Sequence, residues 1–258
     1  MKSFVKHCLR ETLTQSQILA SKKLYISFLS RVYSANLTQL AVIQGTDKWN
    51  HHWYTQHYQT HFNHLRKKKL NILEIGVGGY QNPLAGGSSL RMWKYFFPNS
   101  TIYGLDINDK NALQERRIKI FQGDQSKENC LREIFNKIGS LDIVIDDGSH
   151  VNEHVIISFK TLFPLINAGG IYAVEDTEHS YSASFGGDNE NLNNPATMMN
   201  FFKSLTDGLN HEDLKFFKPG YEPSYFDKNV LSIHFYHNLI IVHKGMERPG
   251  ASPELGRG

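Results

Sequence analysis

Acidic residues and one histidine follow two apolar runs in the middle of the chain. The segment Asp146 to His150 (DDGSH) comes directly after one run, and Glu175-Asp176 comes directly after another. Carboxylates held close together repel one another unless a cation lies among them. A hard divalent ion such as Mg²⁺ prefers oxygen ligands and keeps open positions for a substrate. The pattern therefore predicts a metal site with Asp147, Glu175 and Asp176 as ligands.

His150 lies three residues after Asp147. A neutral alcohol is a poor nucleophile, so group transfer to a hydroxyl requires that its O–H bond be weakened. A metal ion does this by stabilising the alkoxide, and a base does it by accepting the proton. Imidazole exchanges protons near neutral pH, and we therefore predict His150 as the base. Two alternatives stay open: His150 as a residue that starts the next helix, and His154, one turn later, as the base or a supporting group.

A glycine-rich turn at 76–79 (GVGG) follows the apolar run that ends at Ile75. Glycines after a parallel strand let the backbone turn sharply and approach a ligand closely. The dinucleotide fingerprint requires a small residue at its last position, where this chain has Gln81. Residues 80–87 also separate the glycines from the next helix, which does not suit a pyrophosphate held at a helix N-terminus. S-adenosylmethionine has no phosphate, so the turn favours it as the cofactor.

Two further carboxylates follow the next two apolar runs. Asp106 can accept hydrogen bonds from both ribose hydroxyls of a nucleoside, and Asp124 lies where methyltransferases place groups that meet the adenine amine. For each carboxylate alone, a helix cap or a turn residue is an equally good interpretation. The two together, after successive strands, favour a cofactor site.

The elements that must position these residues alternate regularly. Apolar runs at 70–75, 101–105, 118–121, 141–145 and 170–174 predict buried strands, and stretches at 88–97, 127–138 and 151–165 predict helices between them. Such alternation is typical of a parallel sheet. The runs 230–236 and 239–243 are separated by only two residues, which requires an antiparallel hairpin. The predicted fold class is α/β, a Rossmann-like class I methyltransferase sheet that is mostly parallel, ends in an antiparallel hairpin and is flanked by helices.

We predict three parts of the chain: an N-terminal helical extension (1–45), a methyltransferase domain (46–245) and a disordered tail (246–258). Apolar spacing over 15–33 fits an amphipathic helix within the extension. The segment 178–195 is rich in glycine and asparagine and is long for a loop. Such loops are often lids or binding loops.

The composition limits the partners and the compartment. A net charge of +3 is weak support for nucleic-acid binding, and we expect no such partner. No run of eighteen apolar residues predicts a membrane span, and no N-terminal leader is expected. Cys8 and Cys130 are far apart and in no metal-ligand spacing, so we expect free thiols and a cytoplasmic location.

The chain resembles the macrocin/mycinamicin-type sugar O-methyltransferases, a family of class I methyltransferases. Six motifs carry the resemblance: DKW with HWY (47–54), LEIGVGGY (73–80), GGSSLRMW (86–93), FQGDQ (121–125), IDDGSHVNEH (145–154) and VEDT (174–177). The resemblance implies S-adenosylmethionine and Mg²⁺ as cofactors, with Asp147, Glu175 and Asp176 on the metal and His150 as the base. The expected cofactor-binding residues are Lys48, Trp49, Glu74, Gly76, Gly78, Gly79, Ser89, Asp106, Asp124 and Asp146.

The resemblance also implies that segment 47–58 folds over the cofactor, although an aromatic helix packed on the sheet edge is the alternative. Family members carry a sizeable N-terminal domain that helps to form the oligomer and the substrate cavity, whereas about 45 residues precede the match here. We therefore leave a macrolide acceptor and a homo-oligomer open. A glycolipid, a surface polysaccharide or another glycosylated natural product would serve equally well as the acceptor.

We predict an S-adenosylmethionine-dependent, Mg²⁺-dependent O-methyltransferase that acts on a sugar hydroxyl of a glycosylated small molecule or glycoconjugate. One alternative is an NAD-dependent oxidoreductase, which the missing last glycine, the insertion and the terminal hairpin disfavour. Another is a non-catalytic module that binds S-adenosylmethionine. The presence of all four residues proposed for metal binding and proton transfer argues against that module.

Overall fold

The computed structural model describes residues 14–246, and their seven strands form one sheet in the order β3-β2-β1-β4-β5-β7-β6. Strands β1 to β5 are parallel, β7 runs antiparallel to β5, and β6 runs antiparallel to β7. This arrangement confirms the predicted fold class, including the terminal hairpin. The strands are β1 (Asn71–Ile75), β2 (Thr101–Asp106), β3 (Ile118–Gln122), β4 (Leu141–Asp146), β5 (Ile166–Glu175), β6 (Val230–Tyr236) and β7 (Leu239–Lys244).

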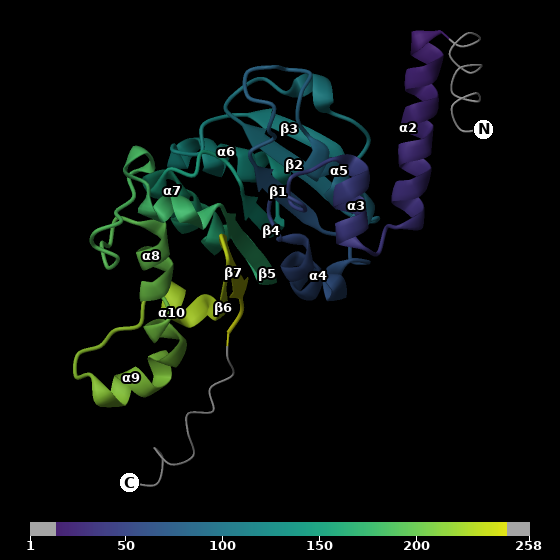
Figure 1. The fold of residues 1–258 in the computed structure, drawn as a ribbon. Coiled ribbons are helices and arrows are strands. Elements are labelled where there is room, and N and C mark those ends of the chain that lie inside the picture. Colours follow the sequence, from purple (N-terminus) through teal and green to yellow (C-terminus); the bar gives the residue numbers. More distant parts are fainter. Residues whose placement is uncertain (1–13, 247–258) are drawn as a thin grey trace.

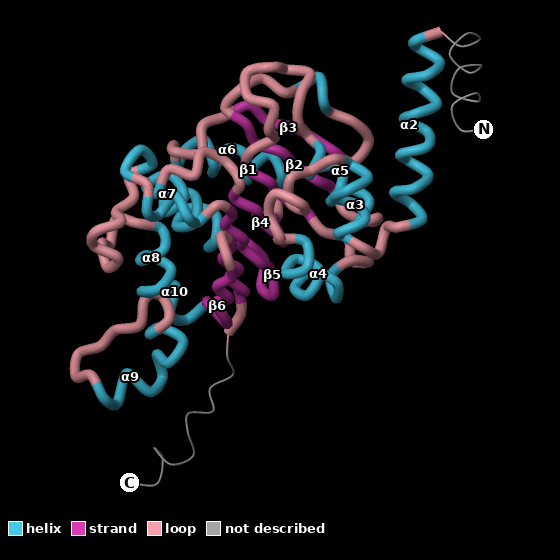
Figure 2. Tube along the Cα trace, viewed as in Figure 1, coloured by secondary structure: helices cyan, strands magenta, loops and turns pink. Residues whose placement is uncertain are grey.

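Helices cover both faces of this sheet, as Figures 1 and 2 show. On one face of the sheet, apolar side chains of the strands pack in a core with α3, α4 and α5. On the other face they pack in a core with α6, α7 and α8. The α-helices are α2 (Gln15–Val32), α3 (Leu37–Gln44), α4 (Thr55–Phe62), α5 (Ser88–Phe96), α6 (Glu128–Ile138), α7 (Asn152–Leu162), α8 (Met198–Ser204), α9 (His211–Phe217) and α10 (Tyr225–Asn229). The short 3₁₀ helices are η1 (Asn63–Leu65), η2 (Asn111–Leu113), η3 (Phe163–Leu165), η4 (Thr177–Tyr181), η5 (Ala183–Phe185) and η6 (Asp207–Asn210).

The central strands β1, β2 and β4 are buried on both faces, as their near-continuous apolar sequences require. In β1, Ile72 packs into one core and Leu73 into the other, because successive side chains of a strand point to opposite faces. Strand β5 begins at Ile166, four residues before the expected start. Ile166 pairs with Leu141 ahead of a register shift, and Gly169, which preceded the expected start at Gly170, lies inside the strand.

The chain reverses its direction of travel across the sheet at β1. It first adds β2 and β3 on one side of β1 and then returns to place β4 on the other side. At this point Ile75 pairs with Leu105 on one neighbour and with Asp146 on the other. Open α/β sheets bind ligands outside the carboxyl ends of the strands at such a switch point, so the fold brings the glycine turn and the acidic segment to the same edge.

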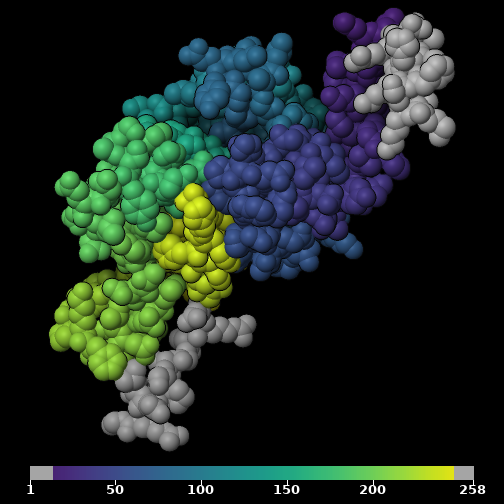
Figure 3. All heavy atoms as spheres, viewed as in Figure 1, coloured from purple at the N-terminus to yellow at the C-terminus, as the bar shows by residue number. Residues whose placement is uncertain are grey.

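The predicted helix at 15–33 is present as α2, and Thr14 caps its N-terminus through a reciprocal pair with Gln17. Its apolar side chains are largely exposed: Leu24 is 72% and Phe28 62% accessible. Figure 3 shows α2 standing out from one end of the molecule. The next helix, α3, differs, because its residues Leu37, Leu40 and Ala41 are buried in the sheet core. That helix packs with the domain, although the predicted boundary at residue 45 assigned it to the extension.

The segment 178–195 contains most of η4 and the whole of η5, and it is tied to α7. Asn152 donates its side-chain amide to the carbonyls of His179 and Phe185 and accepts the N–H of Met198. Its role as a lid stays a prediction. The tail predicted to be disordered lies outside the described residues apart from Met246, as do residues 1–13 and with them Cys8. Within 14–246, no helix has the length and hydropathy needed to cross a membrane, and Cys130 is a free thiol.

Candidate active site

A cavity of about 860 Å³ opens at the switch point of the sheet. The glycine turn after β1 forms one wall, and the loops after β2, β3 and β4 form others. Seven of the predicted cofactor-binding residues line it: Trp49, Gly76, Gly78, Gly79, Ser89, Asp106 and Asp124. The structure thus brings together residues from five separate segments of the chain.

Gly76 shows why the turn requires glycine. Its φ is 92°, and its N–H donates to the carbonyl of Leu105. A Cβ atom at this position would run into the backbone carbonyl of Asp147. Since the N–H of Asp147 in turn donates to Ile75, the loops after β1 and β4 lie directly against each other. The glycine therefore sets how close the proposed metal ligand lies to the cofactor cavity.

The two carboxylates predicted to meet the nucleoside both line the cavity and also hold their own loops. Asp106 accepts the N–H groups of Val77 and Asn108, and Asp124 accepts that of Ser126. The hydrogen bonds from Ser126 lower the pKa of Asp124. Asp106 Oδ1 also accepts the side-chain amide of Asn108, but Asp106 Oδ2 keeps a further lone pair for a ligand, so the turn interpretation and the cofactor interpretation are compatible here.

Lys48 is fully buried and inserts its ammonium group among three carboxylates. Its Nζ lies 2.8 Å from Asp147 Oδ2, 2.7 Å from both oxygens of Glu175 and 3.2 Å from Glu74 Oε1. Burial alone would lower the pKa of this ammonium, but the charges of Asp147, Glu175 and Glu74 outweigh it, so the pKa is raised. Lys48 is therefore charged, and it offsets part of the repulsion within the group.

The carboxylates remain in excess of the cations at this point. Among residues 14–246, no second lysine or arginine forms an ion pair with Glu74, Asp147 or Glu175. Burial, which Lys48 only partly opposes, raises the pKa of Glu74 and of Asp147. Burial together with the charge of Asp147 raises the pKa of Glu175 well above its ordinary value. A group of this kind attracts a further cation.

Asp147, His150 and Asp176 converge at the cavity wall. One potential ligand atom from each lies within 4.8 Å of the other two, and His150 Nε2 is 3.6 Å from Asp176 Oδ2. His150 and Asp176 both adopt left-handed backbone conformations, with φ of 54° and 53°. Such conformations cost about 1–3 kcal/mol in residues other than glycine and cluster at functional sites. The surrounding structure thus holds the backbone of these two residues in a strained conformation, which defines where their side chains lie.

Glu175, the third predicted ligand, lies deeper than this group. It is 2% exposed, and besides Lys48 it accepts a hydrogen bond of 2.6 Å from the Tyr58 hydroxyl at Oε1. A carboxylate oxygen has two lone pairs, so Oε2, which contacts Lys48, can also bind a metal ion. The oxygen-rich donor set, with one imidazole beside it, fits Mg²⁺.

Two tyrosines were not among the predicted site residues. Tyr54 donates to Asp176 Oδ1 at 2.6 Å, and Tyr58, one turn later, reaches Glu175. Their aromatic segment is the one expected either to fold over the cofactor or to pack on the sheet edge. In the structure Trp49 lines the cavity while Tyr58 is buried in the core, and folding over the cofactor stays a prediction. The spacing of Tyr54 and Tyr58, one helical turn apart, was the available signal.

Three predicted cofactor-binding residues do not line the cavity. Lys48, Glu74 and Asp146 are buried behind its wall. Glu74 accepts a hydrogen bond from the Ser89 hydroxyl at 2.8 Å, and thereby holds a residue that does line the cavity. Direct cofactor contact by these three residues stays a prediction that this placement does not favour.

Asp146 is part of a network that supports the loop after β4. It accepts hydrogen bonds from Gln125 at 3.0 Å and from Tyr172 at 3.0 Å, and Gln125 also accepts the N–H of Ser149 at 2.7 Å. Burial raises the pKa of Asp146 to about 6. The network links the loop after β3 with β4 and β5, beneath the loop that carries Asp147 and His150.

The matched relatives are named as O-methyltransferases. The chain is 44% identical over 238 residues to demethylmacrocin O-methyltransferase of Streptomyces fradiae, covering 91% of this chain and 60% of the relative. It is 44% identical over 219 residues to mycinamicin VI 2''-O-methyltransferase of Micromonospora griseorubida, covering 84% of this chain and 55% of the relative. The chain thus spans little more than half the length of these relatives. No protein-family model matches it.

Three of the matching solved structures are of one enzyme. The MycE methyltransferase from the mycinamycin biosynthetic pathway, in complex with Mg and SAH, superposes with a TM-score of 0.81 at 43% identity, covering 86% of this chain and 58% of that one. Its complex with Mg, SAH and mycinamycin VI superposes with a TM-score of 0.78 at 44% identity, covering 82% and 54%. The resemblance carried by the six sequence motifs is confirmed, and over the matched part the chain is a relative of the macrocin and mycinamicin sugar O-methyltransferases.

Proposed function

We propose that this protein is an S-adenosylmethionine-dependent, Mg²⁺-dependent O-methyltransferase whose acceptor is a sugar hydroxyl of a glycosylated natural product or glycoconjugate. The observation that carries the proposal is the convergence of Asp147, His150 and Asp176 on the wall of the cavity that the glycine turn lines. The matched relatives are named as O-methyltransferases, one of them for a rhamnosyl tetracenomycin, and the matched structures contain Mg and SAH.

In this proposal the cavity holds the cofactor. The turn at 76–79 approaches it with backbone atoms, Asp106 faces the ribose and Asp124 the adenine. Trp49 contributes an aromatic wall from the segment before α4. A volume of about 860 Å³ lies within the usual range for small-molecule sites, which supports a ligand of the size of S-adenosylmethionine.

Asp147, Glu175 and Asp176 would hold the metal ion. S-adenosylmethionine supplies the methyl group on its sulfonium, and Mg²⁺ supplies a positive charge that favours the alkoxide form of the acceptor. Tyr54 fixes Asp176 through its hydroxyl, and Lys48 and Tyr58 fix Glu175. The carboxylates are thereby oriented before a ligand arrives, which reduces the reorganisation needed during the reaction.

His150 accepts the acceptor's proton at Nε2 in this mechanism. Asp176 Oδ2 lies 3.6 Å from that atom. The acceptor oxygen then forms its bond to the methyl carbon while the carbon–sulfur bond breaks, and the sulfur retains the electron pair. The products are a methyl ether and the neutral thioether of the cofactor.

The remaining parts of the prediction concern partners and location. A glycosylated small molecule stays the expected partner, with no nucleic acid, and further copies of this chain stay open. A cytoplasmic location is part of the proposal, and the free thiol at Cys130 is compatible with it.

Transfer of a labelled methyl group from S-adenosylmethionine to a panel of glycosides tests the proposal. We expect transfer that EDTA abolishes and Mg²⁺ restores, and that Asp147→Asn abolishes. Glu133→Gln on the exposed face of α6 is the matched control and should leave transfer unchanged. Cofactor binding is read separately from the rise in melting temperature. A rise with NADH and none with S-adenosylmethionine would overturn the proposal in favour of the oxidoreductase.

A further inference from the structure

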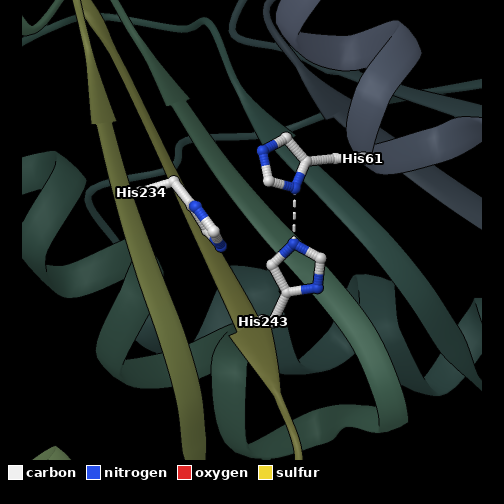
Figure 4. A group of neighbouring side chains, drawn as sticks. All are labelled: His61, His234 and His243. Carbon is white, nitrogen blue, oxygen red and sulfur yellow. Dashed lines mark hydrogen bonds between the residues drawn. The ribbon is translucent and has the colours of Figure 1, made fainter.

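Three histidines from distant parts of the chain meet at the β6–β7 edge of the sheet. His61 lies near the end of α4, His234 on β6 and His243 on β7. The register places His243 opposite Ser232, two residues from His234. Because side chains alternate along a strand, both imidazoles project from the same face of the hairpin, and Figure 4 shows His61 approaching them from the helix side.

The ring nitrogens are close enough to share one ion. One nitrogen from each of the three rings lies within 4.8 Å of the other two, and His61 Nδ1 is 2.7 Å from His243 Nε2. Two nitrogens on a tetrahedral Zn²⁺ ion lie roughly 3.4 Å apart, since each Zn–N bond is about 2.0–2.1 Å. Small rotations of the rings would therefore suffice to admit the ion.

Neighbouring hydroxyl groups lie within hydrogen-bond distance of Nε2 in two of the three imidazole rings. The Tyr236 hydroxyl lies 2.8 Å from His61 Nε2, and Ser232 Oγ lies 3.1 Å from His234 Nε2. Metal-binding histidines are usually oriented in this way, by a hydrogen bond at the nitrogen that does not bind the metal. The alternative to a metal centre is a simple hydrogen bond between two imidazoles. That bond accounts for the contact of His61 with His243 but not for the position of His234 beside them.

The protonation state of the cluster also suits a cation. Burial, with the neighbouring histidines, lowers the pKa of both His61 and His243 to about 4. At neutral pH these imidazoles are therefore neutral and have the free lone pair that a metal ion requires. Neutral imidazole is a ligand for Zn²⁺ and the later transition metals rather than for Mg²⁺.

We propose that His61, His234 and His243 bind a divalent transition-metal ion, Zn²⁺ by preference, with water at the fourth position. This centre is separate from the cofactor cavity, which none of the three residues lines. The ion would join α4 to the β6–β7 hairpin. Since α4 also carries Tyr58, which contacts Glu175, the ion would stabilise the helix that supports the proposed active site.

Titration of Zn²⁺ into the EDTA-treated protein by calorimetry tests the proposal. We expect His234→Ala and His243→Ala each to lower the number of Zn²⁺ ions bound by one per chain. His237→Ala, an exposed histidine in the turn of the same hairpin, should leave the number unchanged. Asp147→Asn should not remove this ion, which separates it from the oxygen site. Equal binding by the His234→Ala, His243→Ala and His237→Ala proteins would overturn the proposal.

A second measurement needs no variant. Diethyl pyrocarbonate modifies accessible imidazoles, and peptide mass spectrometry locates the modified residues. We expect Zn²⁺ to protect His234 at least about 10-fold and to leave His237 unprotected. If His234 is modified equally with and without Zn²⁺, the cluster is a hydrogen-bonded group and not a metal centre.

Discussion

Lys48 Nζ donates a 2.8 Å hydrogen bond to Asp147 Oδ2, and 99 residues separate the two along the chain. Lys48 lies in the segment before α4, and Asp147 follows β4. The same ammonium contacts Glu175 and Glu74. Because its partners come from the ends of three strands, Lys48 fixes the aromatic segment against the sheet edge. The same ammonium group also offsets the negative charge of two proposed metal ligands.

Lys48→Met should destabilise the protein strongly at neutral pH. The substitution removes the cation and leaves buried carboxylates without it, and breaking a buried ion pair in this way costs about 3–5 kcal/mol. Chemical denaturation followed by circular dichroism measures the change in the free energy of unfolding. Lys215→Met, which removes an exposed ion pair with Glu212, is the control and should have little effect.

The deficit of Lys48→Met should shrink as the pH falls. Burial raises the folded-state pKa of Asp147 and Glu175 above their ordinary values of 3.8 and 4.5. A group with a raised folded pKa contributes stability that is present below the unfolded pKa and is lost as the pH rises through the folded pKa. Removing Lys48 raises the folded pKa values further, so the difference from the wild type should be larger at pH 7.5 than at pH 5. A pH-independent deficit would contradict this account.

His150→Ala should retain cofactor binding and lose turnover by about 10²–10⁴-fold, the usual contribution of a general base. His154, also on the cavity wall, contacts the Ser149 hydroxyl at 3.0 Å and was the second candidate base. We expect His154→Ala to reduce turnover far less. Steady-state kinetics and calorimetry with S-adenosylhomocysteine distinguish the two effects. An unchanged turnover number in His150→Ala would remove this residue from the mechanism.

The sheet and the glycine turn could be predicted from the sequence because both depend on local signals. Apolar runs that alternate with helical stretches predicted the parallel strands of the sheet, but not the order in which those strands lie. The hairpin followed from two residues between β6 and β7. The early start of β5 at Ile166 was not predicted, since a glycine pair inside a strand has the same local signal as a turn.

The buried contacts of the site could not be predicted in the same way. Lys48, Tyr54 and Tyr58 lie in a segment without strong periodicity, and the carboxylates that follow β4 and β5, which they contact, are 99 to 127 residues away. The histidine cluster likewise joins residues up to 182 positions apart. Such pairings arise from tertiary packing, so a single sequence gives the residue types but not the contacts.

Tyr54→Phe should weaken the apparent affinity for Mg²⁺ by about 10–100-fold, the usual effect of losing a hydrogen bond to a metal ligand. The substitution removes only the hydroxyl that donates to Asp176. Turnover at saturating Mg²⁺ should recover most of the wild-type value. Tyr95→Phe, which removes a hydroxyl bonded to Ser27 away from the site, is the control. Activity titrated against Mg²⁺ provides the measurement, and identical Mg²⁺ dependence of both variants would argue against Tyr54 as a support of Asp176.

Gly76→Ala should lower the free energy of unfolding by more than the strain of a left-handed backbone conformation alone. Gly76 and Gly139 have similar φ values of 92° and 88°, but a Cβ atom at Gly139 meets no atom within 4 Å, whereas one at Gly76 runs into the Asp147 carbonyl. Gly139→Ala therefore measures the left-handed strain, about 1–2 kcal/mol. We expect Gly76→Ala to cost more free energy of unfolding and to lose cofactor binding, which Gly139→Ala retains. Equal losses in both variants, by denaturation and by calorimetry, would show that the close approach of the two loops is unimportant.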